Sequence, residues 1–479
     1  MTLSWSTTHA QINGTDVRVL VDVSGSMKQA DPKSVRGQAT ALLAALLPEN
    51  SRAGIWLFGS TVRELVPYGS VDSRWNALSK PIETSIGSTD QFTNMEKALS
   101  AGLEPSTKMY GSACHTILIT DGIVDVQGGK DASLASRDRI LESILPNASK
   151  KGCKIHTIAL SEKADLPLLR QMALETDGLF SLINRPGDLI PVMLDALDLA
   201  LRSQQLPVRD GHISIDNTIR QVRVIRLGDN TEIELASNTR QISKKTAKSG
   251  QDWYEGRGYQ TLIWSDPVPD SYRITNALGP KDRILIDTDV ILETPELPST
   301  IIANQTLGLT AFLSKGGEPI NNPNREFRVS FGDDLDPKRT QSSFLQEQID
   351  SPTEGRAVLT IQSFDKNYQR QIQRAFEVLK GETAPEIAQN TAKAVPMTQE
   401  PIEIETDKMP EETVAQMKSN VSAVREKPGQ LLNEIQNQVT EIVPKKIESW
   451  PIWQIIAVAL VMLVLLGFVF KFFMKPKHK

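Results

Sequence analysis

Residues 17–27 of the chain read VRVLVDVSGSM, and this stretch indicates both a fold and a candidate site. Its first seven residues are rich in apolar side chains, which is typical of a strand buried on both faces in the middle of a parallel sheet. Where this strand ends, Asp22, Ser24 and Ser26 occupy alternate positions. A carboxylate and two hydroxyls in one short turn can direct three oxygens at one point, and such oxygens suit Mg²⁺ better than thiophilic metals.

Two other segments also place an oxygen-bearing side chain at the end of a predicted strand or the start of a predicted helix. The segment TNMEKAL, residues 93–99, begins with Thr93 at the start of a predicted helix. The segment TILITDG, residues 116–122, places Asp121 at the end of a second predicted buried strand. In order, spacing and strand context, these residues and the D-x-S-x-S pattern of the first strand resemble the metal-ion-dependent adhesion site of von Willebrand factor A (vWA) domains. The resemblance covers roughly residues 16–205.

The resemblance implies a cation and a set of ligands for it. The cation would be Mg²⁺ or another hard divalent ion. Ser24, Ser26 and Thr93 are implied as direct ligands, and Asp22 and Asp121 as ligands that bind directly or through water. Because only two carboxylates serve the cation, an acidic side chain of another protein can complete its coordination sphere. The family uses its site in this way, so the resemblance implies a protein-docking domain.

A simpler interpretation of the same residues is turn chemistry, because serine, glycine and the Asp-Gly pair are common in turns. We favour the metal site, since five oxygen-bearing residues in three separate loops follow the order of the family's site. Asp90 and Asp125 lie near these loops in the sequence. We interpret them as solvated loop carboxylates rather than as groups that tune the site.

Strand-like and helical segments alternate over residues 16–205, which predicts an α/β domain with a doubly wound, mostly parallel, Rossmann-like sheet. The predicted strands are residues 17–23, 53–58, 115–120, 154–160 and 179–182, with an antiparallel edge strand at 62–66. The predicted helices are residues 32–47 (with Asp31 as N-cap and Pro32 at the first helical position), 74–78, 93–103, 132–145, 166–175 and 188–202. In such sheets ligands bind beyond the carboxyl ends of the strands, and Asp22 and Asp121 both lie there.

Short β-type runs separated by Gly, Pro, Asn and Asp follow this domain. They predict two small all-β modules in tandem, a β-rich module at residues 206–289 and a sandwich-like (Ig-like) module at 290–380. Ahead of the α/β domain, residues 1–15 are a polar lead-in.

The last hundred residues have a different composition. Residues 381–450 contain six prolines, and 12 acidic against 7 basic residues, which predicts a flexible and partly helical linker. Within residues 451–473, the nineteen residues 452–470 carry no charge and would span about 28 Å as a helix, close to the thickness of the hydrocarbon core of a bilayer. We predict a transmembrane helix there, followed by a basic tail at residues 474–479.

The charges that flank this helix predict its orientation. Four lysines follow it within nine residues, whereas only Lys445 and Lys446 lie close to its other end. By the positive-inside rule, the C-terminus is cytoplasmic and the large N-terminal body lies outside. Export would need a signal peptide, and none is visible in this sequence. One explanation is that the N-terminus has been processed or that its start position is assigned wrongly. The other is that the protein is tail-anchored and its body is cytoplasmic. We favour the first, in a bacterial inner membrane with a periplasmic body.

Composition and motifs argue against several classes of function. A net charge of −5 indicates no basic surface for nucleic acid. The sequence has no nucleophile elbow, phosphate-binding P-loop or H-E-x-x-H motif. His115 and His156 fall in predicted strands, at the wrong end of the sheet from Asp121, and we interpret them as core or edge histidines. We therefore expect a protein that is not an enzyme and that has no small-molecule substrate.

The two cysteines, Cys114 and Cys153, each open a predicted strand, and the resemblance implies that these strands are sheet neighbours. Their geometry allows a disulfide if the domain faces an oxidising compartment. We favour the alternative, two buried free thiols.

The main hypothesis is a membrane-anchored protein whose vWA-like domain captures an acidic residue of a partner protein through Mg²⁺. In this hypothesis the β modules set the distance and orientation of the vWA-like domain, and the extended linker lets the domain reach its partner. The chain resembles bacterial vWA proteins that carry one C-terminal anchor. One alternative is a cytosol-facing adaptor for an AAA-type ATPase or a metal-cofactor insertion machine. The other is a structural envelope protein in which the site only stabilises the fold.

Overall fold

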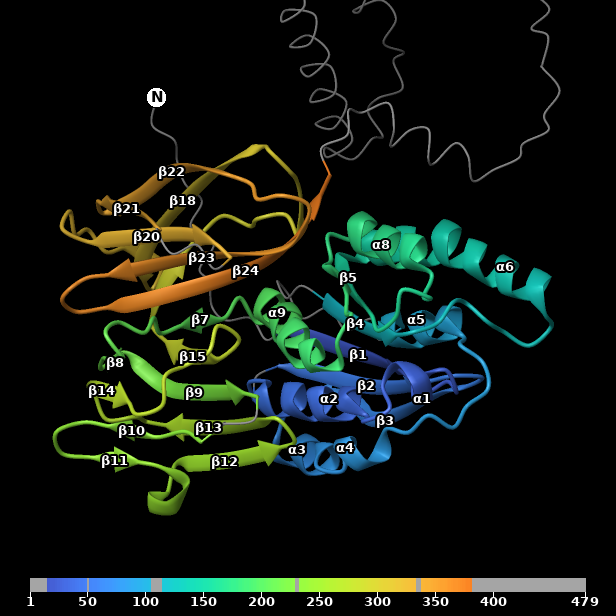
Figure 1. Cartoon of the computed structure of the whole chain (residues 1–479), viewed down its shortest axis with the longest axis horizontal. Helices are drawn as coiled ribbons and strands as arrows, with labels where there is room; N and C mark the ends of the chain where they lie inside the picture. The colour runs from blue at the N-terminus through green and yellow to red at the C-terminus, as the bar shows by residue number, and fades with distance from the viewer. Residues whose placement is uncertain (1–14, 50, 105–113, 229–231, 333–336, 381–479) are drawn as a thin grey trace, which may run out of the picture. The chain divides into compact units, whose positions relative to one another are not determined.

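A computed structural model of the chain describes residues 15–49, 51–104, 114–228, 232–332 and 337–380 (Figure 1). All of them belong to one compact unit, Met1–Ile387. The predicted linker, transmembrane helix and basic tail lie outside the described residues, and so does all of the lead-in except Thr15. Within the described ranges, no helix has the length and apolar character needed to cross a membrane.

The first part of the chain forms a six-stranded sheet in the order β3-β2-β1-β4-β5-β6, as predicted for a doubly wound domain. Its strands are β1 (Asp16–Asp22), β2 (Arg52–Phe58), β3 (Val62–Ser70), β4 (Cys114–Thr120), β5 (Cys153–Ala159) and β6 (Phe180–Leu182). Five strands pair in parallel, and β3 is the antiparallel edge strand. Every residue of β1 and β4 is buried, which agrees with their apolar sequences.

Helices cover both faces of this sheet (Figure 1). They are α1 (Met27–Ala30), α2 (Val35–Leu46), α3 (Ser73–Ser79), α4 (Ile82–Ser85), α5 (Met95–Leu103), α6 (Lys130–Arg139), the π-helix η1 (Ile140–Ile144), α7 (Leu145–Lys151), α8 (Leu166–Glu175), the 3₁₀ helix η2 (Pro186–Asp188) and α9 (Leu189–Leu201). Val19 and Val21 of β1 pack in one apolar cluster with α2 and α9. Leu20, which points to the other face, packs in a second cluster with α5 and α8.

Two helices begin two or more residues later than predicted. The helix expected from residue 32 begins at Val35, although the carboxylate of Asp31 still accepts from the backbone N–H of Val35 at 2.7 Å and of Arg36 at 3.0 Å. Asp31 therefore satisfies donors of the first turn from outside the helix, and Pro32 is not its first residue. The helix expected from Thr93 is α5, which begins at Met95, so Thr93 lies in the loop before it.

The second part of the chain consists of strands, as predicted. They are β7 (Gln204–Gln205), β8 (His212–Ile215), β9 (Ile219–Leu227), β10 (Leu235–Ala236), β11 (Gln241–Ile242), β12 (Gln251–Gly256), β13 (Tyr259–Ser265), β14 (Asp270–Ile274), β15 (Arg283–Thr288), β16 (Val290–Glu293), β17 (Thr300–Ile302), β18 (Thr306–Lys315), β19 (Glu318–Pro319), β20 (Glu326–Phe331), β21 (Lys338–Gln341), β22 (Phe344–Asp350), β23 (Gly355–Phe364) and β24 (Gln369–Leu379). A short 3₁₀ helix, η3 (Lys244–Thr246), lies among them.

The two β regions each have their own apolar core, but they are not separate sheets. A ten-stranded sheet includes the path β12-β13-β9-β15-β7-β24-β23-β20-β21 and so runs through both. The short strand β7 makes the join, because it pairs with β15 on one side and β24 on the other. Two modules in tandem were expected. The structure differs because β24, the last long strand, pairs with β7 and so joins the sheet that contains the strands of the first β region.

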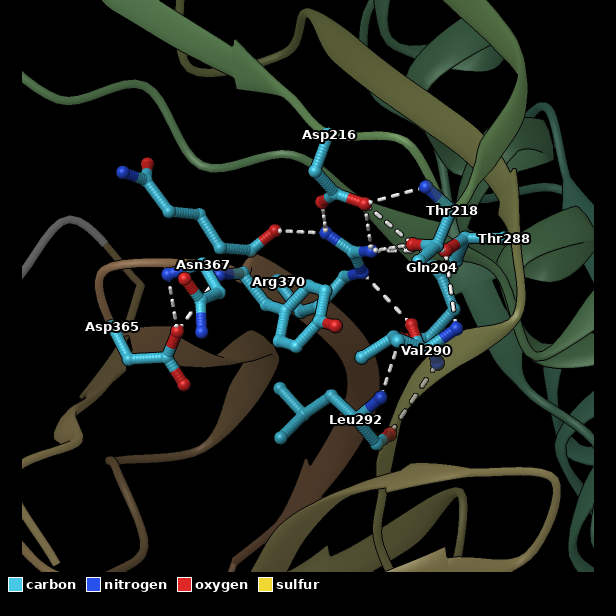
Figure 2. A network of polar contacts seen from close by, with 11 residues as sticks. Gln204, Asp216, Thr218, Thr288, Val290, Leu292, Asp365, Asn367 and Arg370 are labelled. Atoms are coloured by element: carbon cyan, nitrogen blue, oxygen red, sulfur yellow. Dashed lines mark hydrogen bonds and ion pairs between the residues drawn. The ribbon is translucent and has the colours of Figure 1, made fainter. Parts of the chain in front are cut away.

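Arg370 of β24 joins the two β regions at the point where they meet (Figure 2). Its side chain is fully buried. It donates to the carboxylate of Asp216 at 2.7 Å and to the hydroxyls of Thr218 and Thr288 at 2.9 Å each. It also donates to the carbonyl of Val290, the first residue of β16, at 2.8 Å. One guanidinium thus holds acceptors from three segments, which suits its planar set of five donors.

We expect Arg370→Met to lower the free energy of unfolding of the β regions by about 3–5 kcal/mol, because it leaves the Asp216 carboxylate without its buried partner. Denaturant titration followed by tryptophan fluorescence measures this effect, since Trp264 lies in the adjacent core. The matched control is Arg220→Met, which breaks half-exposed ion pairs with Asp287 and Asp289 and should cost less than about 1 kcal/mol. Equal effects of the two substitutions would contradict the role given to Arg370.

The cysteines are paired, contrary to the free thiols that we favoured. Cys114 opens β4 and Cys153 opens β5, and the two residues stand directly opposite each other in the sheet. Their Cα atoms lie 4.4 Å apart and their sulfur atoms form a disulfide. The sequence placed both residues at strand starts, but only the register of β4 on β5 makes them partners.

His115 and His156 are core residues, as predicted. Both are buried, and their rings stack with 5.3 Å between centroids. Burial lowers the pKa of His156 to about 3, with a smaller contribution from Lys154. Burial also lowers the pKa of His115, and His156 and Lys154 add to this effect. Both rings are therefore neutral at neutral pH.

A lowered pKa in the folded protein means that the unfolded chain takes up the proton first as the pH falls. The contribution of His156 to stability is therefore complete above pH 6.5 and is lost between that value and pH 3. Between pH 7 and pH 5 we expect the loss to be about 2 kcal/mol. Denaturant unfolding of wild type and His156→Gln at both pH values checks this, because the variant should show a pH dependence that is smaller by this amount. Identical pH dependences would show that His156 does not titrate as described.

Candidate metal centre

Asp22 is the last residue of β1, and both of its carboxylate oxygens are held in place. Oδ1 accepts from the backbone N–H of Ser24 at 2.8 Å. Oδ2 accepts from the hydroxyl of Thr120, the last residue of β4, at 2.6 Å. The first contact is the local turn chemistry of the simpler interpretation, and the second comes from a distant strand. The sequence did not single out Thr120, whose only signal is its position one residue before Asp121.

Three of the predicted site residues form a continuous chain of oxygens. The hydroxyl of Ser26 donates to Oδ1 of Asp121 at 2.8 Å, and the hydroxyls of Ser24 and Ser26 lie 3.1 Å apart. Since the single proton of Ser26 goes to Asp121, Ser26 can only accept from Ser24, whose own proton goes either to Ser26 or to the carboxylate of Asp22. Both serine oxygens then keep lone pairs that receive no proton within this chain. Lone pairs of this kind are what a cation accepts.

Thr93 reaches the same place from a third loop. Its backbone N–H donates to the carbonyl of Asp125 at 2.9 Å, and the N–H of Asp125 donates back to the carbonyl of Thr93 at 3.1 Å. A Cβ added to Gly122 would lie 3.2 Å from the hydroxyl oxygen of Thr93. The Thr93 hydroxyl therefore lies against the residue that follows Asp121, and a side chain at Gly122 would crowd it. The structure thus brings together the three loops that the sequence singled out.

The two carboxylates that we interpreted as solvated differ from each other. Asp125 is exposed, and its role in the site is the backbone pairing with Thr93. Asp90 is half-buried and accepts from the hydroxyl of Ser60. Burial acts to raise the pKa of Asp90, but the hydrogen bonds from Ser60 and from the N–H of Gln91 lower it overall. Asp90 is thus a charged residue that holds the loops together rather than a freely solvated one.

Arg36 organises the site, although the sequence analysis did not identify it. It is fully buried in α2 and donates to the backbone carbonyl of Asp22 at 3.2 Å and to the carboxylate of Asp31 at 2.8 Å. It also donates to the carbonyl of Gly87 and the hydroxyl of Ser88, both at 2.6 Å. It therefore fixes the end of β1 to the loop that leads to Thr93. The only signal in the sequence is a charged residue at the start of an apolar helix.

The electrostatics of the cluster favour a bound cation. Burial raises the pKa of Asp22 to about 6, against the opposing effect of the hydrogen bonds from Ser24 and Thr120, and the neighbouring Asp121 adds to the rise. Burial also raises the pKa of Asp121, although its hydrogen bond from Ser26 lowers it. Asp22 has no exposed surface and Asp121 only 5%. The nearby guanidinium of Arg36 is already paired with Asp31, so no cationic side chain among the described residues forms an ion pair with either site carboxylate.

The spacing of the oxygens fits a small octahedral ion. Two adjacent ligands that each lie about 2.1 Å from Mg²⁺ are about 3 Å apart, and the Ser24–Ser26 and Ser26–Asp121 contacts are 3.1 and 2.8 Å. Across the described ranges, no three His, Cys, Asp or Glu side chains gather to hold a metal, so a cation here would rely on hydroxyl oxygens beside two carboxylates. Ser26 is exposed, which opens this cluster to the outside.

The sequence of the first part of the chain matches a family model. The family model of the von Willebrand factor type A domain matches residues 16–188. No curated protein matches the chain at a significant level.

Three solved structures illustrate the similarity. A von Willebrand factor type A protein from Catenulispora acidiphila is 12% identical with a TM-score of 0.35, over 80% of this chain and 72% of that one. The conserved hypothetical protein BatB from Bacteroides thetaiotaomicron is 16% identical with a TM-score of 0.31, over 40% of this chain and 100% of that one. Proximal thread matrix protein 1 from the mussel byssus, solved with a zinc-occupied MIDAS motif, is 17% identical with a TM-score of 0.30, over 41% of this chain and 49% of that one.

These identities and TM-scores are low, and the family assignment rests on the sequence match. The matched range begins with β1 and ends at Asp188, directly before α9, so it contains the whole six-stranded sheet and all three loops of the oxygen cluster. Residues 16–188 of this chain are a von Willebrand factor type A domain.

Proposed function

We propose that this chain is a membrane-anchored, non-catalytic protein that binds a partner protein through a divalent cation at the oxygen cluster of its vWA domain. The observation that carries the proposal is the chain of Ser24, Ser26 and Asp121, in which two buried residues and one exposed residue present unprotonated oxygen lone pairs at the surface. Mg²⁺ is the ion that we propose for hard oxygen ligands at this spacing.

Each residue has a defined part in this proposal. Asp22 and Asp121 supply the negative charge, and Ser24, Ser26 and Thr93 supply neutral oxygens. When bound, the cation offers a Lewis-acid position that an acidic side chain of the partner can fill. Thr120 and Arg36 do not bind the ion but orient Asp22 and its loop. With only two carboxylates, a bound dication is just neutralised and keeps a coordination position that they do not fill, and this open position favours an acidic partner.

The contacts of the two serines support binding rather than catalysis. In the described part of the chain, their side chains contact each other, Asp22 and Asp121, and neither has a hydrogen bond to a histidine, lysine or cysteine that could act as a base. His115 and His156 belong to the opposite end of the sheet and are buried there. We therefore propose that the domain has no catalytic role and no small-molecule substrate.

The disulfide supports a location outside the cytoplasm. Disulfides persist in oxidising compartments and are rare in the cytosol. Together with the lysines that follow residues 452–470, this supports a single-pass protein of a bacterial inner membrane with a periplasmic body. The cytosol-facing adaptor remains the alternative that an accessibility experiment decides.

The metal prediction concerns Asp121→Asn in the full-length protein. We expect this substitution to weaken Mg²⁺ or Mn²⁺ binding at least tenfold, because it removes one of only two charges that serve the ion. Isothermal titration with the metal alone measures the effect. The matched control is Asp125→Asn, which makes the same change on an exposed neighbour and should alter the affinity less than twofold.

The same variants test partner binding. A pull-down from membranes should recover a partner with wild type and Asp125→Asn, and should lose it with Asp121→Asn or with EDTA. Ser26→Ala provides a second site variant that should fold normally, because this side chain is exposed. A partner that stays bound in EDTA would contradict the mechanism. Unfolding of Asp121→Asn, combined with unchanged capture by folded Ser26→Ala, would favour a purely structural site.

The location prediction concerns the thiols. We expect Cys114 and Cys153 to resist alkylation by maleimide when cells are lysed in denaturant without reductant, and to react fully after reduction. Cys114→Ser is the control, since it should leave Cys153 reactive without reductant. In parallel, protease added to spheroplasts should degrade the N-terminal body. A protected body with two reactive thiols would instead support the cytosol-facing adaptor.

A further inference from the structure

A second polar site lies at the other end of the vWA sheet from Asp22 and Asp121. It is a cavity of about 60 Å³. The strands β4 and β5 begin beside it, α9 ends there, and the segment after β16 and strand β24 complete its walls. The titratable residues that line it are His115, Lys154, His156, Arg202, Glu296 and Arg374. None of them belongs to the metal centre.

The hydrogen bonds of the two histidines determine their tautomers. The backbone N–H of Leu179 can only donate, and it donates to Nδ1 of His156 at 3.0 Å. The proton of His156 is therefore on Nε2, which lies 2.9 Å from Nδ1 of His115. Nδ1 of His115 must then be the acceptor, so the proton of His115 is on its own Nε2. Among the described residues this last N–H has no acceptor, although His115 is only 4% exposed and lines the cavity.

Arg374 is a second donor group without a matching acceptor. Its one hydrogen bond to the described residues is from Nη1 to the carbonyl of Gln373 at 2.8 Å, and no carboxylate in those ranges forms an ion pair with it. Burial lowers its pKa and Arg202 adds to this effect, while Asp198 opposes it. A guanidinium has five N–H donors, so most of those on Arg374 remain available.

The acidic groups around the cavity are already shared among other cations. Glu296 accepts from Lys154 at 2.7 Å and lies 3.5 Å from Arg202. Lys154 also pairs with Asp177. Asp198 lies 3.7 Å from the guanidinium of Arg283 and accepts from Gln205 at 3.3 Å. Within the described ranges, these contacts leave the Nε2–H of His115 without an acceptor and give Arg374 only the carbonyl of Gln373.

The missing acceptor has to be small and rich in oxygen lone pairs. A space of this size holds a few water molecules or one tetrahedral anion, and it is too small for a nucleotide. Charge-assisted hydrogen bonds from arginine favour anionic oxygens over neutral ones. We propose that this cavity binds a small inorganic oxyanion, phosphate or sulfate, through the guanidinium of Arg374 and the Nε2–H of His115. The bound anion would connect β4 of the vWA domain to β24 of the β region.

Calorimetric titration of the full-length protein in detergent with inorganic phosphate, and separately with sulfate, tests this proposal. EDTA is present throughout so that no anion binds through a metal at Asp22, and chloride at the same ionic strength is the reference. We expect saturable binding of one anion per chain. Arg374→Gln should weaken it at least tenfold. Arg339→Gln makes the same change on the exposed strand β21 and should leave the affinity unchanged.

A second measurement on the wild type covers the case in which Arg374→Gln does not fold. With ¹⁵N-labelled histidine, both rings should show the Nε2–H tautomer, and phosphate should shift the Nε2 signal of His115 but not that of exposed His212. Absence of saturable binding, equal binding by folded Arg374→Gln, or an unmoved His115 signal would each overturn the proposal and leave a cavity filled by water. None of these results would affect the metal centre, because the two sites share no residue.

Discussion

The parallel pairing of β1 with β4 is the constraint on which the candidate site depends. In this register Val21 stands opposite Ile119, so that Asp22 and Thr120 end their strands side by side. The hydrogen bond of 2.6 Å between these two end residues is a direct consequence. The chain beyond each strand then leaves the sheet at the same edge, which brings Ser26 to Asp121. A shift by one residue would turn every side chain of the strand to the opposite face and separate the oxygens.

Buried arginines hold together loops and strands whose relative positions apolar packing alone would not define. Arg36 connects the end of β1 to the loop before Thr93, and Arg370 connects the two β regions. At the junction of the vWA domain with the β regions, Arg283 faces Asp195 of α9 at 3.3 Å, and Arg356 pairs with the same carboxylate. Each guanidinium can serve several acceptors in one plane, so a single side chain orders several loops. Such buried pairs contribute more to a defined arrangement than to net stability.

These observations give the molecule two polar centres of opposite character at opposite ends of one sheet. At the carboxyl ends of β1 and β4, buried carboxylates with raised pKa values lie beside hydroxyl oxygens, and no side chain in the described ranges forms an ion pair with them. At the amino ends of β4 and β5, the described residues offer no acceptor to an imidazole N–H and only one, a backbone carbonyl, to a guanidinium. The disulfide lies next to the second centre, because Cys114 precedes His115 and Cys153 precedes Lys154. The strand β4 therefore leads into the candidate metal centre at one end and carries the disulfide to β5 at the other.

The amino-acid sequence by itself indicated the six strands of the vWA domain and its longer helices, and singled out the five candidate ligands, because burial patterns and turn residues are local properties of the chain. It also indicated an apolar segment at residues 452–470, which lies outside the described part. The tertiary structure alone decided the pairing of Cys114 with Cys153, the roles of Arg36, Thr120 and Arg370, and the sheet shared by the two β regions. Each of these depends on which strand lies beside which and in what register. That choice comes from contacts between residues far apart in the chain, and no local pattern records it.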